Sequence, residues 1–455
     1  NFIFYLAQGN AQVNAILQTQ GLAATTEQTC EDLRSFTTEV NKRWNLYGRH
    51  FVSLNGPGNH SGPASVQANG GGSCTFPFFQ GQCSLTPPDP PCERAEADLI
   101  ASMHPAMVLA PTADPAFYNQ LGKDQIPVWG GETEPDSYHT GVAPFYWDVF
   151  ESGTLTAQMD AEYWCKKLNG KRVQWAGAAP GDVMTFNGIA QPPPVRKLAI
   201  VYPATNGDPT YKISVDLELS LVNGKECAPA GGQAIEIAYQ SDINTAQTQS
   251  NTIVAELKQQ HITDVEAFGD PIAPVFFSNT ADSQNYHPEV FMSGMGLIDY
   301  DVLGQLYNHN VWKNAFGPSS LFDNVPFAQS EGAKAWADAG NSGPPPDQTL
   351  NLAWAYFSAM GTSFQMAGPN ANPGTIRDGL WSLPPRGGDQ HHTLLSFKGV
   401  YTGIQDMREV WWCGTQNSII NNHPGAYVSV DDPIWRHQLG QWPTTLKVFP
   451  NGPCP

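Results

Sequence analysis

The chain has 455 residues, of which 41% are hydrophobic and 14% charged, and its formal net charge is -19. Disordered chains combine low hydrophobicity with high charge, so this composition indicates a folded protein, and the length suggests two or three domains. The negative charge repels phosphate backbones, and no cluster of lysine and arginine offsets it, which argues against nucleic acid as a partner.

The first third of the chain alternates short apolar runs with segments of helical period, which is the pattern of βα units around a parallel sheet. Thr25 and Gln28 form a capping-box pattern at the start of one helix. Helices are also predicted over 93–103 and 114–125, and strands over 2–9, 49–55, 106–112 and 126–133.

Residues 56–92 have the glycine, proline and serine content of a loop. They are too many for a plain connection, so we expect their three cysteines to hold them as a disulfide-stapled insertion.

A second series of the same kind follows. The apolar runs predict strands over 172–177, 196–204, 234–242, 274–279 and 289–294, and the periodic segments predict helices over 156–168, 248–260, 299–312, 331–340 and 350–364. Two similar α/β lobes would explain both series. Residues 144–154, "PFYWDVFESGT", form an aromatic segment that crosses between them.

The eight cysteines contain no Cys-x-x-Cys pair and no zinc-ligand spacing with histidine. Their even number favours disulfides outside the reducing cytosol, and no metal site is predicted. The pairing does not follow from the sequence; a Cys413–Cys454 bridge and one within 56–92 are guesses. No run of about 18 apolar residues predicts a membrane span, and no signal peptide is recognised, so an exported protein would be a processed form.

Signatures of common enzymes are missing: there is no GxSxG elbow, no HExxH, no P-loop and no complete dinucleotide fingerprint. The stronger signal lies at four predicted strand ends, where "VLAPT", "VWGGET", "IVYPAT" and "VFFSNT" change abruptly from apolar to polar. In parallel α/β sheets ligands bind beyond the carboxyl ends of the strands, so these four ends predict a ligand site.

The segment "PVWGGETEP" (127–135) shows this change most clearly. Trp129 would belong to the sheet and the pocket wall, and Gly131 would let the backbone approach a ligand. Glu132 and Thr133 would supply polar contacts, although a plain strand turn with a helix cap explains them equally well. Trp147 and Asp148 in the crossing segment suit a cation, a sugar-like solute or an amide, but also suit a packed hinge.

The chain resembles the type I periplasmic solute-binding proteins, the branched-chain amino acid-binding family of transport receptors. The resemblance covers nearly the whole chain. It rests on the residues of the segments at 30–54, 107–133, 196–204 and 355–384 and on their order along the chain. The segment "EYWCKKLNGKRVQWAG" (162–177) is similar to long actinobacterial-type, and thus bacterial, members.

The resemblance implies an α/β fold of two Rossmann-like lobes joined by three crossovers, with a solute trapped by hinge closure. It assigns residues 1–148 and about 293–395 to one lobe, and 149–292 and about 396–455 to the other. Trp129 and Trp147 would stack on the ligand. The remaining polar and aromatic contacts carried over by position are Thr112, Glu132 and Thr133 in the first lobe and Tyr202, Phe277, Ser278 and Asn279 in the second.

We therefore expect a non-enzymatic, extracytoplasmic protein that needs no cofactor and delivers a small solute, such as an amino acid or amide, to the membrane permease of an ABC transporter. It would lie in the periplasm or on the cell surface, and a lipid anchor upstream of Asn1 is left open. Two alternatives use the same fold: a hydrolase-like enzyme whose chemistry lies in the cleft, and a surface structural or sensory protein that has lost transport.

Overall fold

A computed structural model describes most of the chain. The described residues are 1–8, 11–18, 21–22, 24–54, 65–67, 76–85, 87–131, 134–176, 193–204, 209–346, 350–429, 436–444 and 454.

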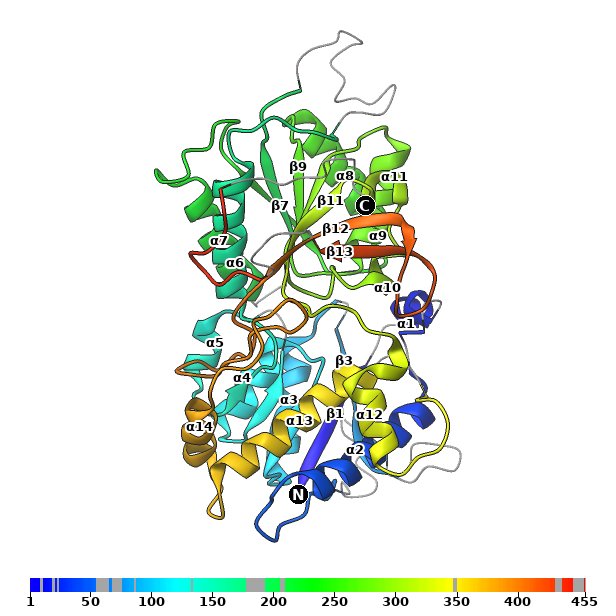
Figure 1. Cartoon of the computed structure of the whole chain (residues 1–455), viewed down its shortest axis with the longest axis vertical. Coiled ribbons are helices and arrows are strands. Elements are labelled where there is room, and N and C mark those ends of the chain that lie inside the picture. Colours follow the sequence, from blue (N-terminus) through cyan, green and yellow to red (C-terminus); the bar gives the residue numbers. More distant parts are fainter. Residues whose placement is uncertain are drawn as a thin grey trace. The chain divides into compact units, whose positions relative to one another are not determined.

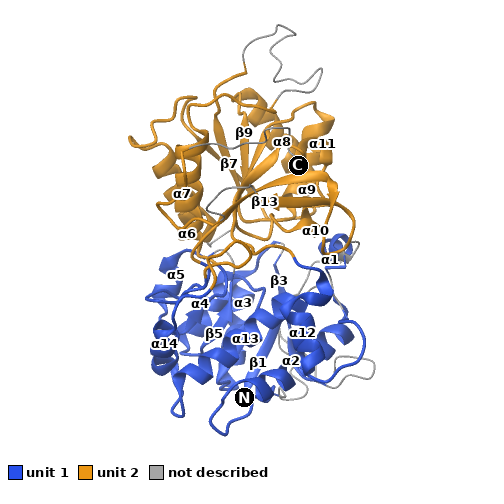
Figure 2. Ribbon diagram, in the orientation of Figure 1, with its two compact units in different colours: residues 1–150, 325–386, 395–404 blue, residues 151–324, 387–394, 405–455 orange. Residues whose placement is uncertain are grey.

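The chain forms two compact units, and each is assembled from separate stretches of sequence (Figure 2). Unit 1 comprises residues 1–150, 325–386 and 395–404, and unit 2 comprises residues 151–324, 387–394 and 405–455. Residues 293–324, which the sequence assigned to the first lobe, lie in unit 2, because their strand pairs with the sheet of that unit.

Unit 1 contains a six-stranded sheet with the order β2-β3-β1-β4-β5-β6 (Figure 1). Only β2 and β3 pair antiparallel; the other neighbours are parallel. The strands are β1 (Phe2–Gln8), β2 (Ser65–Gln67), β3 (Phe78–Ser84), β4 (Met107–Ala110), β5 (Val128–Gly130) and β6 (Tyr146–Trp147). The α-helices are α1 (Ala11–Gln18), α2 (Thr26–Arg43), α3 (Pro90–Ser102), α4 (Pro115–Lys123), α5 (Asp136–Gly141), α12 (Glu331–Asp338), α13 (Leu350–Ala367) and α14 (Pro373–Ser382), with a 3-10 turn at Phe327–Gln329.

Strand β1 explains why this sheet is buried on both faces. Phe2 and Phe4 pack with α2 and α13, whereas Ile3 and Tyr5 pack with α3 and α4, because alternate side chains of a strand point to opposite faces. The predicted capping box is confirmed: the Thr25 side chain accepts from the Gln28 amide, and Gln28 accepts from the Thr25 amide.

Unit 2 contains a seven-stranded sheet with the order β13-β12-β11-β10-β9-β7-β8, parallel from β8 to β11 and antiparallel beyond. Helices α6 and α7 pack along one face, and α8, α9 and α11 along the other (Figure 1). The strands are β7 (Leu198–Ala204), β8 (Ile235–Gln240), β9 (Asp264–Ala267), β10 (Glu289–Met292), β11 (Ala315–Ser319), β12 (Arg408–Asn417) and β13 (Pro424–Ser429). The helices are α6 (Gly153–Tyr163), continued by a π-helix at Trp164–Leu168, α7 (Thr210–Val222), α8 (Ala246–Gln259), α9 (Ala273–Ser283), α10 (Asp301–Gly304) and α11 (His309–Trp312).

Four predictions of local structure are wrong, and one strand was missed. The predicted strand 274–279 is part of helix α9, and the strand that precedes it, β9, was missed. Of the predicted strands 49–55 and 172–177, the described residues 49–54 and 172–176 contribute only isolated bridges, at Ser53 and Arg172. The predicted loop 56–92 contains β2 and β3, so it adds two strands to the edge of the sheet.

Three disulfides join described cysteines: Cys83–Cys92, Cys165–Cys227 and Cys413–Cys454. The first lies within the predicted stapled segment and the third is the bridge guessed from the sequence, so both guesses are confirmed. Among the described residues, no helix combines the length and the apolar character that crossing a bilayer requires.

Candidate functional site

The carboxyl ends of β5 and β6 in unit 1 bring several polar groups around Gly131. The backbone of Gly131 has φ +89°, which favours glycine. A Cβ atom built there would lie 2.3 Å from the Tyr146 hydroxyl, 2.5 Å from Oε2 of Glu134 and 3.2 Å from Oδ2 of Asp148. Glycine is therefore required for both its conformation and its size, and it lets two carboxylates and a phenol converge on the backbone.

Burial and hydrogen bonds within unit 1 hold the polar groups around Gly131 in place. Burial raises the pKa of Tyr146 well above its usual range, and the nearby Glu134 carboxylate adds to the shift, so the phenol keeps its proton. Asp148 accepts a hydrogen bond from the Phe150 amide at 2.9 Å, and the carbonyl of Gly131 accepts one from the Tyr356 hydroxyl at 3.1 Å. These hydrogen bonds fix the backbone at both strand ends.

The two tryptophans predicted to stack on a ligand belong to the core of unit 1. Trp129 and Trp147 are both 0% exposed and pack against each other at a ring separation of 5.8 Å. Their indole N–H groups donate to Ser363 Oγ and the Pro144 carbonyl. Stacking on a solute would need a free ring face, which this packing does not leave.

The other predicted residues of unit 1 follow strands β4 and β5. Thr112 is exposed just beyond β4, where a strand-end contact could lie. Glu132 and Thr133 lie outside the described residues.

In unit 2 the structure separates the predicted residues. Tyr202 is in β7 with its ring in the core, and burial followed by the charge of Glu236 raises its pKa to about 12. Phe277, Ser278 and Asn279 lie in the middle of α9 rather than at a strand end, so their predicted placement is wrong. Ser278 accepts from the Asn308 amide, which anchors the helix to the next segment.

The strand end that the sequence analysis missed follows β9. Gly269 has φ +77°, and its carbonyl accepts from the Tyr211 hydroxyl at 3.2 Å. Asp270 accepts from the Tyr239 hydroxyl at 2.7 Å and from the Ile272 amide at the start of α9. "FGD" at 268–270 carries the same apolar-to-polar change as the predicted ends, but acidic residues within β9 hid the strand.

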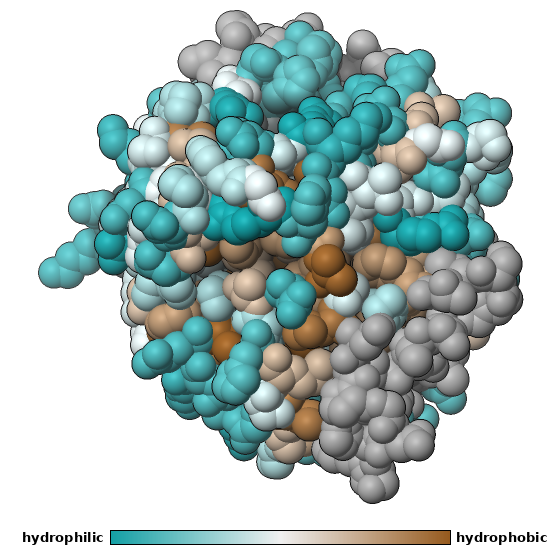
Figure 3. Space-filling view, turned by 90° about the horizontal axis from the view of Figure 1, so that it is seen from below, coloured by the Kyte–Doolittle hydropathy of each residue, from teal (hydrophilic) through white to brown (hydrophobic). Residues whose placement is uncertain are grey.

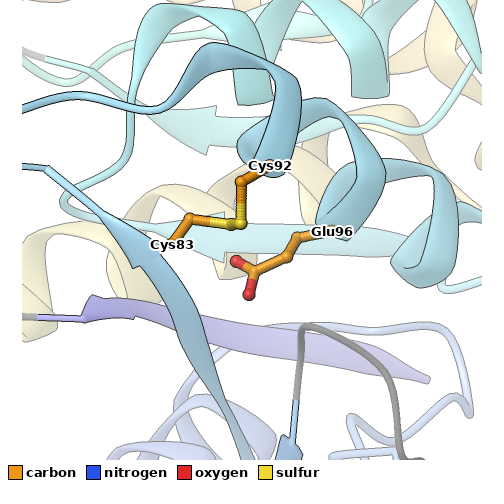
Figure 4. Close-up of side chains that lie close together, drawn as sticks. All are labelled: Cys83, Cys92 and Glu96. Atoms are coloured by element: carbon orange, nitrogen blue, oxygen red, sulfur yellow. A yellow bond between two sulfur atoms is a disulfide. The ribbon is translucent and has the colours of Figure 1, made fainter.

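A further polar cluster joins β1, β3 and α3 of unit 1. The Tyr5 hydroxyl donates to Glu96 at 2.6 Å and lies 3.3 Å from Glu93, and the second oxygen of Glu96 accepts from the Gln82 amide at 2.6 Å. Glu96 points toward the sulfurs of Cys83 and Cys92 (Figure 4). Those sulfurs are bonded to each other, so the group cannot supply thiolate ligands to a metal.

Glu93 gives a pH-dependent prediction. Burial, with the nearby charges of Glu96 and Asp114, raises the pKa of Glu93 from 4.5 to about 9. The folded protein therefore keeps a proton that the unfolded chain loses, and this contribution to stability is complete below about pH 4.5 and is lost as the pH rises toward 9. We expect Glu93→Gln to reduce the fall in unfolding free energy between pH 5 and 9, measured by urea unfolding. Glu27→Gln, at an exposed glutamate, is the control; equal slopes in wild type and Glu93→Gln would contradict the prediction.

A cavity of about 180 Å³ lies at the opposite edge of the unit 1 sheet, next to Asn1 and Ala106, which precede β1 and β4. Its Arg49 donates to backbone carbonyls, including that of Gly368 at 2.7 Å. Figure 3, which views the molecule from below, shows hydrophobic residues grouped among hydrophilic ones. Because parallel sheets bind ligands at the carboxyl ends of their strands, this amino-end cavity is not the candidate site.

No protein-family model matches the chain, and neither does the sequence of any curated protein. Solved structures do match it. A solute-binding protein of an ABC transporter from R. palustris, in complex with 4-hydroxybenzoate, is 10% identical over 97% of this chain and 99% of its own, with a TM-score of 0.58.

Two amino acid-binding proteins give similar values. A branched-chain amino acid ABC transporter protein from Thermus thermophilus with bound valine is 9% identical over 97% of each chain, with a TM-score of 0.59. A branched-chain amino acid transporter substrate binding protein from Streptococcus pneumoniae in complex with isoleucine is 12% identical over 94% of this chain and 99% of its own, with a TM-score of 0.54. The chain therefore has the fold of the type I periplasmic solute-binding proteins of ABC transporters, as its sequence predicts.

Proposed function

We propose that this protein is an extracytoplasmic solute-binding protein that captures a small molecule by hinge closure and delivers it to an ABC-type permease. The observation that carries the proposal is the match of nearly the whole chain to solved solute-binding proteins, three of which hold a small ligand. The polar strand ends of each unit support it, since these are the edges at which parallel α/β sheets bind ligands.

The side chains at these edges favour a solute with an amine or amide group. Asp270, which is partly exposed, follows β9 in unit 2, and the buried Glu134 and Asp148 place further negative charge at the strand ends of unit 1. Carboxylates accept hydrogen bonds and attract cations, whereas a benzoate would be repelled by them. We therefore propose an amino acid or an amide as the solute, with Thr112, Glu132 and Thr133 as further contacts.

Native mass spectrometry of the protein as isolated, followed by thermal shift against amino acids, amides, sugars and aromatic acids, tests this proposal. A true ligand at 100 times its dissociation constant should stabilise the protein by about 2.7 kcal/mol, and the shift should grow with concentration. Asp270→Asn should weaken that shift, whereas Thr252→Ala, at an exposed site on α8, should not.

The same experiment separates the proposal from its alternatives. A protein that retains no small molecule and is stabilised by none of these solutes would contradict a transport function. Chemical conversion of a solute during the incubation would instead favour an enzyme on this fold.

A further inference from the structure

Three acidic side chains meet inside unit 2. Asp160 lies on α6, Glu218 on α7 and Glu266 on β9, and one carboxylate oxygen from each lies within 4.8 Å of the other two. All three residues are 0% exposed. Helices α6 and α7 lie side by side along the sheet, so the three carboxylates meet in the layer between helices and sheet (Figure 1).

The three carboxylates lack the cation that two other buried acids of this unit, Asp264 and Glu289, pair with. Asp264 lies two residues before Glu266 on β9 and forms an ion pair with Arg196, which also pairs with Glu289. None of the six oxygens of Asp160, Glu218 and Glu266 has a hydrogen-bond donor among the described residues outside the three. Within the group, the side chains of Glu218 and Glu266 interact with each other.

The surrounding charged groups increase the excess of negative charge around these three carboxylates. Besides the members of the group, Glu151 and Asp299 act on Asp160, and both are acidic. Burial and this repulsion raise the pKa of all three acids well above the usual range. Burying three uncompensated carboxylates would cost several kcal/mol for each ion, so positive charge must enter the group.

Two buried hydroxyls on the same two helices point independently to a ligand. Thr156 lies four residues before Asp160 on α6, and Ser214 lies four residues before Glu218 on α7, so each hydroxyl shares a helix face with its carboxylate. Thr156 is 0% and Ser214 1% exposed, and neither side-chain oxygen has a hydrogen-bond partner among the described residues. A helical residue's side chain leans toward the preceding turn, which brings each carboxylate toward its hydroxyl.

We propose that Asp160, Glu218 and Glu266 bind one divalent cation, and that Ca²⁺ fits the site better than Mg²⁺. Ca²⁺ is held by several carboxylate oxygens in flexible geometry, whereas Mg²⁺ usually keeps several waters and takes one or two carboxylates, so three fully buried carboxylates suit Ca²⁺ better. We assign the Thr156 and Ser214 hydroxyls, each one helical turn before one of the acids, as the further oxygen donors of the site. The cation joins α6, α7 and β9, so its function is to stabilise unit 2, whether or not the protein binds a solute.

Refolding of the full chain with and without free Ca²⁺, in the absence of any solute, tests the site. Refolding is needed because the group is fully buried and the ion must enter before the core closes. We expect one Ca²⁺ per chain by elemental analysis after gel filtration. The thermal midpoint should rise with each tenfold increase in free Ca²⁺, since binding to the folded state alone stabilises it by mass action. Mg²⁺ should give a smaller rise at equal concentration.

The double variant Glu218→Gln/Glu266→Gln removes two charged ligands with little change in shape. It should bind Ca²⁺ at least about tenfold more weakly, because affinity depends on the number of charged ligands. Glu256→Gln, at an exposed glutamate of α8, should bind Ca²⁺ as wild type does.

Two results would overturn the proposal. One is a wild-type protein that refolds with no Ca²⁺ and has the same midpoint in Ca²⁺ and in chelator. The other is a double variant that is more stable than wild type at pH 8 but not at pH 5, with no response of either to Ca²⁺. That second result would show that shared protons, rather than a cation, neutralise the group.

Discussion

Arg196→Met is expected to lower the unfolding free energy of unit 2 by about 3–5 kcal/mol, the usual effect of removing one partner of a buried ion pair. The Arg196 guanidinium is fully buried; its Nε donates to Glu289 at 2.8 Å and lies 3.3 Å from Asp264. Methionine fills much of the same volume but leaves two buried carboxylates without a cation. Hydrogen exchange of β7 and β9, with urea unfolding, measures the loss.

The stability of the Arg196→Met variant should also depend on pH. Burial raises the pKa of Asp264 well above the usual range, so acid supplies the proton that replaces the missing cation. Stability lost at pH 8 should therefore be partly recovered at pH 5. Adding Asp264→Asn and Glu289→Gln to Arg196→Met should recover part of the lost stability at both pH values.

Arg377→Met provides the matched control, because Arg377 pairs with Asp378 on the surface and such pairs contribute about 1 kcal/mol or less. If Arg196→Met and Arg377→Met had the same small effect, Arg196 would not be the cation that permits these acids to be buried.

Removing the Cys165–Cys227 disulfide is the second large effect that we expect. The bridge closes a loop with a sequence separation of 62, and the chain-entropy relation gives about 4 kcal/mol for a loop of this length. It also ties the π-helix that follows α6 to the segment after α7. The Cys165→Ser/Cys227→Ser variant should therefore unfold at clearly lower urea concentration than wild type.

The Cys83–Cys92 bridge serves as the comparison within the same chain. Its sequence separation is 9, for which the same relation gives about 2.5 kcal/mol. Equal losses for the two double variants, or a larger loss for Cys83→Ser/Cys92→Ser, would show that native packing rather than loop length sets the stabilisation.

The sequence predicted the fold class because its core strands are continuous apolar runs. Strands such as β4 and β10 are buried along their whole length, and each stands before or after a helix with one apolar face. Strand β9 was missed because Asp264 and Glu266 interrupt its apolar pattern. Asp264 is tolerated there because it pairs with Arg196, whose proximity is a property of the folded sheet and leaves no local signal. The neighbouring helix α9 begins with "APVFF", a short run of β-type residues that resembles a strand when taken alone.

The sequence predicted that the candidate site lies at strand ends, but it identified only some of the residues there. The sequence indicated Gly131 and Asp148, which the structure brings to the ends of β5 and β6. Glu134 and Tyr146 were not chosen, although their side chains lie closer to Gly131, because only the fold brings Tyr146 beside the strand end. Trp129 and Trp147 were wrongly assigned to ligand stacking, because the sequence around an aromatic residue next to a polar turn does not show whether its ring faces a ligand or the core.

The division of each unit among separate stretches of chain affects how the protein can fold during its synthesis. Strand β11 ends at Ser319, and its antiparallel partner β12 begins only at Arg408. At about 5–20 residues per second, a ribosome needs roughly 4–18 s to make the chain between them. For that interval the edge of β11 has no partner on one side, and unpaired strand edges recruit other chains. The nascent protein should therefore be most prone to aggregation, and most dependent on chaperones, while residues 320–407 are being added.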